Sequence, residues 1–321
     1  MELPPRLRQA IDRMLEGTPL ADLQSSADLL SRRYRSETRD GRLHVADALA
    51  AKAYLATRLP ATYAAIRRAI SDAAEVSGES PKSLLDIGSG PGTALWAALE
   101  EWPGIDEAVL VEASAAMRGV SEALAQGIGP VRLSWRGMAV EGGLADIDAA
   151  DLVTLCYVLD ELDPDVADAL IRRLWALARG MLLVVEPGTP AGWRRILKVR
   201  QILIEAGAQI VAPCVHQNGC PIREPDWCHF SRRVARSRLH RLAKGGEVPW
   251  EDEKFVYLAA SHEAVEARGS RVLAPPRTAS GMVRLKLCSA EGQVEERLVT
   301  RREGAAFKAA KRLDWGDLLE E

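Results

Sequence analysis

The sequence predicts an α/β fold, in which a doubly wound sheet follows an N-terminal helical domain and carries a cysteine-rich insert. Three observations predict it. Apolar residues recur at helical spacing through residues 1–77. Short apolar runs then alternate with helical segments, which is typical of a parallel sheet wrapped by helices. Finally, three of the five cysteines fall between residues 214 and 228, in a segment rich in Pro, Trp and His.

Length and composition bound the possibilities. The chain has 321 residues, 47% of them hydrophobic, enough for one large domain or two modest ones with a buried core. Its net charge is only −3, so any nucleic-acid surface would have to be local. No run reaches the roughly 18–20 apolar residues that cross a bilayer. The start, "MELPPRLRQAIDRMLEG", has no signal-peptide core. We therefore expect a soluble, intracellular protein with no membrane partner.

The N-terminal helical domain is predicted over residues 1–77. Its apolar periodicity is clearest in "LRQAIDRMLEG", "LADLQSSADLLSRRYR" and "HVADALAAKAYLATRLPATYAAIRRAI". Pro60 is expected to end or kink the third of these helices, because proline lacks the N–H that the helix interior needs. The stretch "EVSGESPK" follows as a linker.

The sheet core is predicted over residues 78–207. Its strands are the runs "SLLDI", "AVLVE", "VRLSW", "DLVTLCYVL" and "MLLVVEP", with helical segments between them. A cysteine-rich, metal-binding and basic insert then occupies 208–253. The runs "KFVYLAAS" (254–261) and "MVRLKLCS" (282–289) are expected to be the final strands of the same sheet, within 254–292. Residues 293–321 are predicted as a basic C-terminal tail.

A glycine-rich turn follows the first predicted strand, in "LLDIGSGPGTALWAALEEWP". Such a turn lets the backbone approach a ligand, and the next helix offers its N-terminal amides. The dinucleotide-binding pattern would need a third glycine at Thr93. The pattern found, G-x-G-x-G after an acid, resembles motif I of the class I S-adenosylmethionine methyltransferases, which have a Rossmann-like sheet. An acid that closes the second strand is placed to accept the ribose hydroxyls. The candidate cofactor-binding residues are Asp86, Gly88, Ser89, Gly90, Gly92, Glu112, Cys156 and Tyr157.

No catalytic constellation for methyl transfer is evident. The Asp/Asn-Pro-Pro-aromatic tetrad of amino-group methyltransferases is absent after the fourth strand, where "LCYVLDELDP" stands. The dipeptide Pro213-Cys214 imitates the nucleophile of carbon-5 cytosine methyltransferases, but it follows the fifth strand. Cys156 is expected to be a small apolar core residue, and Asp160 or Glu161 could face the cofactor. The catalytic residues, and whether the chain is an enzyme, are left open.

The cysteines of the insert are spaced C-x5-C-x7-C, as Cys214, Cys220 and Cys228. Three thiolates invite a fourth ligand, for which His216, His229 and Cys288 are candidates. If the strand that ends in Cys288 returns beside the insert, it completes a four-thiolate site. Such a site suits zinc or an iron–sulfur cluster, and the spacing alone names neither.

The stretches "CVHQNGCPI", "DWCHFSRRVARSRLHR" and "EDEKFVYLAAS", downstream of "LDIGSGPGTALWA", resemble the methyltransferase-like assembly factors of the mitochondrial small ribosomal subunit and their bacterial relatives. The resemblance runs from about Leu30 to Cys288. It implies a [4Fe–4S] cluster, with zinc as the alternative, and docking on small-subunit ribosomal RNA and ribosomal proteins. Since no import presequence is evident, we expect a bacterial cytoplasmic protein, or a mitochondrial-matrix protein if eukaryotic, and a monomer. The implied cluster ligands are Cys214, Cys220, Cys228 and Cys288.

A surface for RNA is predicted in "SRRVARSRLHRLAKGG" (231–246), which contains no acid. Contacts to six phosphates would make affinity fall with salt at a log–log slope of roughly 4 to 5. A second basic stretch is "VTRREGAAFKAAKR" (299–312). The predicted RNA-binding residues are Arg232, Arg233, Arg236, Arg238, Arg241 and Lys244.

Three functions remain open from the sequence. The chain is an assembly factor that binds its cofactors structurally, an active ribosomal-RNA methyltransferase with a structural zinc site, or a small-molecule methyltransferase.

Overall fold

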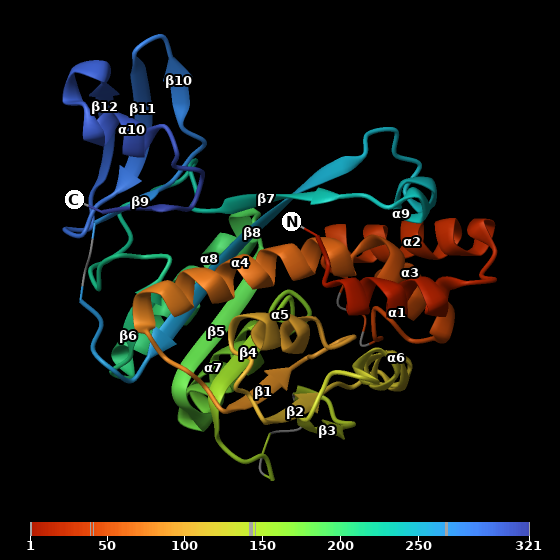
Figure 1. Ribbon diagram of the computed structural model, residues 1–321. Coiled ribbons are helices and arrows are strands. Elements are labelled where there is room, and N and C mark those ends of the chain that lie inside the picture. Colours follow the sequence, from red (N-terminus) through yellow and green to blue (C-terminus); the bar gives the residue numbers. More distant parts are fainter. Residues whose placement is uncertain are drawn as a thin grey trace.

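The computed structural model describes residues 2–38, 40, 42–140, 144, 146–266 and 269–320. Figure 1 shows N-terminal helices beside a central sheet, and a separate C-terminal lobe that projects from one end of that sheet. In this view the helix α4 runs from the N-terminal helices across the central sheet.

The N-terminal region is helical, as predicted. One helix ends at Thr57 and the next begins at Leu59, so Pro60 stands in the first turn of a new helix. A proline there removes no hydrogen bond, because the first N–H groups of a helix have no partner within it. The helices are α1 (Pro5–Leu15), α2 (Leu20–Arg35), α3 (Ala48–Thr57) and α4 (Leu59–Ser77).

The main sheet has the strand order β3-β2-β1-β4-β5-β8-β6, and β7 pairs with the far part of β8. The first five strands run parallel, whereas β8 is antiparallel to β5, β6 and β7. The strands are β1 (Ser83–Ile87), β2 (Glu107–Val111), β3 (Arg132–Arg136), β4 (Ala150–Cys156), β5 (Ala178–Pro187), β6 (Gln209–Ala212), β7 (Phe230–Ala235) and β8 (Trp250–Ser261). The helices among them are α5 (Thr93–Glu101), α6 (Ala115–Ala125), α7 (Pro164–Leu177), α8 (Pro190–Glu205) and α9 (Arg238–Ala243).

Helices cover both faces of this sheet. Leu84 and Leu183 belong to a core that includes residues of α4, α5 and α6, whereas Leu85 and Val184 belong to a second core with α7 and α8. Neighbouring residues of one strand point to opposite faces, and burial of both faces explains why these strands read as unbroken apolar runs. The doubly wound α/β architecture is confirmed.

The C-terminal part differs from the prediction. Of the two late runs, only "KFVYLAAS" joins the main sheet, within β8; "MVRLKLCS" forms β11 of a second, five-stranded sheet. Its strands are β9 (Ser270–Val272), β10 (Arg277–Ala279), β11 (Met282–Cys288), β12 (Val294–Thr300) and β13 (Leu318–Leu319). β11 pairs with β10, which precedes it in the chain, and with β12, which follows it. Its Val283, Leu285 and Leu287 pack in a small core with Val299 and Ala310. Local hairpins therefore replace the expected long return to the main sheet.

Residues 293–321 were expected as a basic tail, and most of them are folded instead. They supply β12, a 3-10 helix (Arg301–Glu303), α10 (Ala305–Ala310) and β13. We call residues 269–320 the C-terminal lobe. No helix in the described part of the chain is long and apolar enough to cross a membrane.

Candidate functional site

The glycine turn between β1 and α5 has a backbone that other residues would strain. Gly88, Gly90 and Gly92 adopt φ angles of 64°, 52° and 81°. A Cβ atom on Gly88 would lie 2.4 Å from Cγ2 of Val158, which is far inside van der Waals contact. The glycines therefore supply left-handed backbone at three positions and, at Gly88, a close approach to the loop after β4.

Two acids accompany this turn. Asp86 is buried; its Oδ1 accepts a hydrogen bond from Thr154 Oγ1 at 2.7 Å, and its Oδ2 has no partner among the described residues. Burial raises the pKa of Asp86 to about 7. Glu112 accepts hydrogen bonds from the N–H groups of Gly90 at 2.9 Å and Ser114 at 2.7 Å. Burial raises the pKa of Glu112, and these N–H groups oppose that rise. Glu112 thus joins the loops after β1 and β2.

A cavity of about 940 Å³ opens at the carboxyl ends of the parallel strands, where open α/β sheets bind their ligands. Five of the eight predicted cofactor residues line this cofactor pocket. They are Gly88, Gly90, Glu112, Cys156 and Tyr157. The other three, Asp86, Ser89 and Gly92, are not among its lining residues. Asp160 and Glu161 both line it, and burial raises the pKa of Glu161 to about 8.

The second wall of the pocket comes from the N-terminal helices. Tyr34, Glu37, His44 and Arg58 line it, although they precede the glycine turn by 30 or more residues. Sequence reasoning missed this wall. Within the described part of the chain, the non-glycine residues with positive φ are Glu37 (45°) and Tyr157 (58°), and both line the pocket. Strained backbone conformations of this kind are found most often at active sites and ligand-binding sites.

An ion-pair chain ties this wall to the core. Arg195 on α8 donates to both carboxylate oxygens of Glu37 at 3.1 Å, and its Nε donates to Glu186 Oε2 at 2.7 Å. Glu186 is fully buried and also accepts from the N–H of Leu159. Burial raises the pKa of Glu186, and the positive charge of Arg195 opposes that rise. Seven Asp and Glu residues line the pocket against four Lys and Arg residues, and this excess of acids suits a ligand with positive charge.

A second, small cavity of about 30 Å³ brings the predicted metal ligands together. All four of Cys214, Cys220, Cys228 and Cys288 line this four-cysteine cavity, along with His216. Cys288 Sγ lies 3.5 Å from His216 Nε2. Burial raises the pKa of Cys288 to about 12, and the neighbouring thiols Cys214 and Cys220 add to the rise. In the described ranges, no three or more His, Cys, Asp or Glu side chains are arranged to hold a single metal ion.

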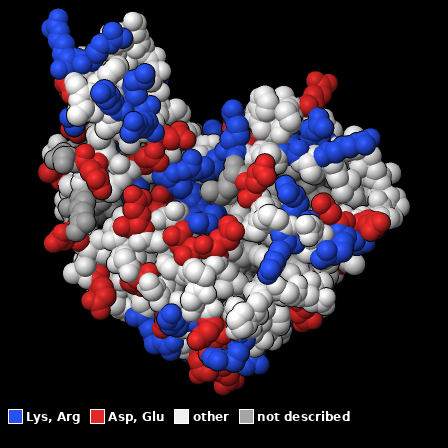
Figure 2. Space-filling model, viewed as in Figure 1, with Lys and Arg blue, Asp and Glu red and all other residues white. Residues whose placement is uncertain are grey.

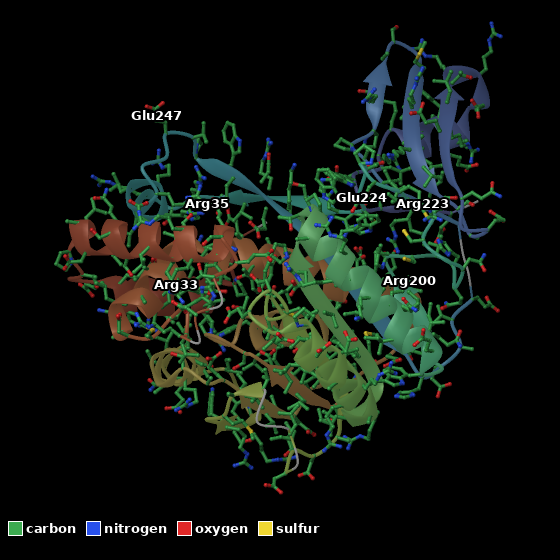
Figure 3. The ribbon with its side chains drawn as sticks, turned by 180° about the vertical axis from the view of Figure 1, so that it is seen from behind. Arg33, Arg35, Arg200, Arg223, Glu224 and Glu247 are labelled. Carbon is green, nitrogen blue, oxygen red and sulfur yellow. The ribbon has the colours of Figure 1, made fainter. Side chains whose placement is uncertain are left out.

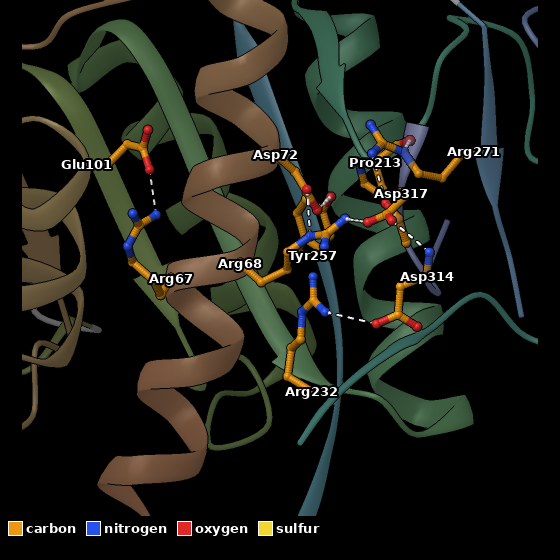
Figure 4. Close-up of polar contacts among 11 residues, drawn as sticks. Arg67, Arg68, Asp72, Glu101, Pro213, Arg232, Tyr257, Arg271, Asp314 and Asp317 are labelled. Carbon is orange, nitrogen blue, oxygen red and sulfur yellow. Dashed lines mark hydrogen bonds and ion pairs between the residues drawn. The ribbon is translucent and has the colours of Figure 1, made fainter. Parts of the chain in front are cut away.

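Two arginines border the same cavity. Arg271 is 1% exposed, donates from Nε to the carbonyl of Pro213 at 2.9 Å and from Nη1 to that of Gly316 at 2.9 Å. Its Nη2 has no partner in the described structure. Figure 4 shows Arg271 beside Pro213, the neighbour of Cys214. Arg200 donates to the carbonyls of His216 and Asn218. Both guanidinium groups favour thiolates, lowering the pKa of Cys288 against the effect of burial.

The predicted RNA-binding stretch is largely neutralised in the fold. We call residues 231–246 the basic arm. Its strand β7 pairs with β8, and this register sets Arg232 opposite Glu253 and Arg233 opposite Asp252. Four of the six predicted cations form ion pairs: Arg232 with Asp314, Arg233 with Asp252, and Arg236 and Lys244 with Glu251. Among the described residues, Arg238 and Arg241 have no ion pair. Glu251 and Asp252 come from the following strand and Asp314 from the C-terminal lobe, so the stretch itself gave no sign of these acids.

Comparisons with known proteins identify the family of this chain. The family model described as "Mitochondrial small ribosomal subunit Rsm22" matches residues 48–320. The chain is 28% identical over 297 residues to the human "Ribosome assembly protein METTL17, mitochondrial", covering 83% of this chain and 61% of that protein. It is 23% identical over 321 residues to the "Rsm22-cox11 tandem protein 2, mitochondrial" of Schizosaccharomyces pombe. That match covers 83% of this chain and 42% of the relative. The chain thus spans about half the length of these relatives.

Solved methyltransferase structures are also similar. An O-methyltransferase family protein from Burkholderia thailandensis matches with a TM-score of 0.45 and 15% identity, over 77% of this chain and 72% of that one. Magnesium protoporphyrin IX methyltransferase from Synechocystis, with bound SAM, matches with a TM-score of 0.40 and 15% identity, over 77% and 100%. The α/β Rossmann-like methyltransferase fold itself is evident in the strand order, with its central mixed sheet.

Proposed function

Because this chain belongs to the Rsm22 family of the mitochondrial small ribosomal subunit, we propose that it is an assembly factor of the small ribosomal subunit that binds adenosylmethionine and a [4Fe–4S] cluster. The human relative is by name a mitochondrial ribosome assembly protein. Since the chain covers only part of that relative, the role comes to it as a proposal. Its location, in a bacterial cytoplasm or a mitochondrial matrix, and its monomeric state stay predictions.

Support for adenosylmethionine comes from the glycine turn and the acids around the cofactor pocket. Glu112 would hold the ribose, and Asp86, whose Oδ2 has no partner among the described residues, would lie near the amino group of the methionine part. Gly88 and Gly90 line the pocket, and a Cβ on Gly90 would meet no atom within 4 Å, so this part of the turn would leave room for the cofactor. When bound, the cofactor supplies an electrophilic methyl group on a sulfonium. Its positive charge would favour the ionised forms of Asp160 and Glu161, against the effect of burial on these carboxyl groups.

Support for the cluster comes from the four-cysteine cavity, and this observation carries the proposal. Three thiols of the insert and one from β11, which is 60 residues further along the chain, face one small space. A tetrahedral zinc ion would draw its sulfur ligands to about 2.3 Å from one point. A four-thiol set also suits a [4Fe–4S] cluster, and the likeness to the small-subunit assembly factors favours the cluster over zinc. Arg200 and Arg271 would offset the negative charge of four thiolates.

A second candidate function, methylation of ribosomal RNA, is favoured by the size of the cofactor pocket. Its volume of about 940 Å³ lies near the top of the roughly 300–1,000 Å³ range of small-molecule sites. Its second wall, with Tyr34 and His44, lies beyond the glycine turn and would border an acceptor. Tyr157, which follows β4 directly and has a left-handed backbone, lines the same pocket.

The two functions are separated by incubating the purified chain with immature small subunits and methyl-labelled adenosylmethionine. We expect the chain to sediment with the immature subunits and the RNA to remain unlabelled. Label in the RNA would favour the methyltransferase. If the chain stays in the supernatant and no label transfers, the ribosomal role is contradicted. Isolated large subunits serve as the matched control for non-specific sedimentation.

A further inference from the structure

The C-terminal lobe carries a local excess of positive charge. Residues 277–312 contain nine Lys and Arg but only four Asp and Glu, a net charge of +5, whereas the whole chain has a net charge of −3. Figure 2 shows Lys and Arg gathered on the outer part of this lobe, with Asp and Glu nearer its base. The excess is therefore exposed to solvent on the part of the lobe furthest from the core.

Six of these cations are exposed and have no ion pair with any described residue. We call them the C-terminal basic patch: Arg277, Arg301, Arg302, Lys308, Lys311 and Arg312. Two neighbouring acids are already engaged. Glu303 accepts hydrogen bonds from the N–H of Thr300 at 2.6 Å and from its hydroxyl at 3.1 Å, and Glu296 pairs with Arg284 at 3.5 Å. The patch therefore keeps its charge in the folded chain.

The fold holds these cations on a rigid support. The N–H of Arg301 donates to the carbonyl of Gly281 at 2.8 Å, which fixes the 3-10 helix against the β10–β11 turn. In α10, Ala310 is buried and Phe307 is half-buried against the core of the lobe. Lys308, by contrast, is exposed, and so are the residues that follow the helix, Lys311 and Arg312. Cations on a packed scaffold lose little freedom when they bind.

The basic arm differs in this respect, because ion pairs cover most of its charge. Arg236 and Lys244 share Glu251, whose carboxylate is only 12% exposed. To contact phosphate, these side chains would first have to leave a partner. The cations of the C-terminal basic patch have no such partner among the described residues.

We propose that the C-terminal basic patch, and not the basic arm, is the principal contact surface for the phosphate backbone of structured RNA. This inference rests on the proposed ribosomal function and names the part of the chain that serves it. Arginine is well suited to phosphate because its planar guanidinium donates two parallel hydrogen bonds. Among the residues that the structure describes, the large hydrophobic side chains exposed on the lobe are Met282, Val294 and Leu298, none of them aromatic. Stacking on unpaired bases is therefore not favoured, and backbone contacts are.

The test compares two double variants of the full chain, each with two exposed arginines replaced: R301Q/R302Q in the patch and R233Q/R238Q in the arm. The probe is a fluorescently labelled transcript of small-subunit ribosomal RNA, titrated at several salt concentrations. We expect the patch variant to lower the log–log salt slope by about 1.4 to 1.8 and to weaken binding at least ~10-fold at low salt. The arm variant should change the slope by less than about 0.5. Thermal unfolding of both variants checks that neither loses its fold.

The outcomes distinguish a failure of the basic-patch inference from a failure of the proposed ribosomal function. If the wild-type chain binds the transcript and the arm variant loses more of the slope than the patch variant, the patch assignment is wrong while the ribosomal function stands. If both variants bind as the wild type does, and R301Q/R302Q instead loses a ribosomal protein partner, the patch contacts protein and the inference is again overturned. If the wild-type chain does not bind at low salt, the patch and the proposed function fail together.

Discussion

The cofactor pocket and the four-cysteine cavity differ in almost every physical respect. One has a volume of about 940 Å³ and is rich in carboxyl groups; the other has about 30 Å³ and is bordered by four thiols and two arginines. Figure 3 shows Arg35, which lines the first, far from Arg200, which lines the second. The pocket, wide and lined by acids, suits the cationic cofactor that we propose for it. The cavity, small and lined by thiols and arginines, is where we propose an anionic centre that joins distant segments of the chain.

The largest effect is expected at the cavity, from Cys288→Ser. Structural metal binding contributes on the order of 10 kcal/mol to folding. Loss of one ligand should therefore disorder the junction between the insert and β11, lower Tm by at least about 10 °C and abolish the visible absorption of the anaerobically purified protein. Absorption spectra and thermal unfolding measure both effects.

The fifth cysteine supplies the matched control, because Cys156 lines the cofactor pocket and not the cavity. Cys156→Ser should keep the visible absorption and shift Tm by only a few degrees. Equal losses of visible absorption and of Tm in Cys288→Ser and Cys156→Ser would mean that the cluster does not depend on the four-cysteine cavity alone.

At the pocket, Gly88→Ala should weaken the binding of adenosylmethionine about 100-fold and destabilise the chain by about 2–3 kcal/mol. The added Cβ would meet the stiff side chain of Val158 at 2.4 Å. Gly78→Ala is the control: its φ of 65° carries a similar backbone strain, but its Cβ would meet no atom within 4 Å. Calorimetric titration should show normal cofactor affinity for that variant. Normal affinity in Gly88→Ala would remove the glycine turn from the site.

A smaller effect is expected from pH. Burial raises the pKa of Asp86 to about 7, so its carboxyl group must lose a proton before it can pair with a cationic ligand. Affinity for adenosylmethionine should therefore rise about tenfold between pH 6 and pH 8. Without the cofactor, the free energy of unfolding should fall as pH rises from about 4 to 7, because the folded state holds this proton more tightly. Asp86→Asn should make both profiles shallower by the share of one carboxyl group, while the raised pKa values of Glu161 and Glu186 leave a remainder. Profiles unchanged in this variant would assign the titration to other groups.

The smallest effect is expected where the N-terminal wall meets the core. Glu37→Gln weakens the bidentate pair with Arg195 and should raise the Kd for adenosylmethionine a few-fold, because the wall is held less firmly. The control is Glu224→Gln, which removes the ion pair between Glu224 and Arg194, the residue before Arg195. The side chains of Arg194 and Glu224 are 58% and 62% exposed, so the loss of this pair should leave the Kd unchanged. Identical affinities for the two variants would mean that the Glu37–Arg195 ion pair does not hold the wall of the pocket.

The sequence was most informative where a structure depends on neighbours in the chain. The run of strands from Ser83 to Pro187 and the glycine turn follow from local periodicity and backbone freedom, and the structure confirms the strands. The predicted meeting of Cys288 with the insert also occurs, although β11 arrives there in a second sheet. A strand's apolar alternation says that it has a buried face but not which sheet it joins.

What the sequence did not predict depends on contacts between distant segments. Of the acids that neutralise the basic arm, Glu251 and Asp252 lie on β8 and become its neighbours only when β7 pairs with that strand, and Asp314 comes from the C-terminal lobe. The N-terminal wall of the pocket carries no motif, because Tyr34 and Glu37 acquire their role through packing against loops that follow much later. Charge and site composition therefore have to be judged after folding.

The central claim is that four cysteines enclose one iron–sulfur centre, and metal analysis of the anaerobically purified wild-type chain tests it most directly. The account predicts about four iron and four acid-labile sulfide per chain, in a brown protein. One zinc ion per chain, without iron or sulfide, would contradict it.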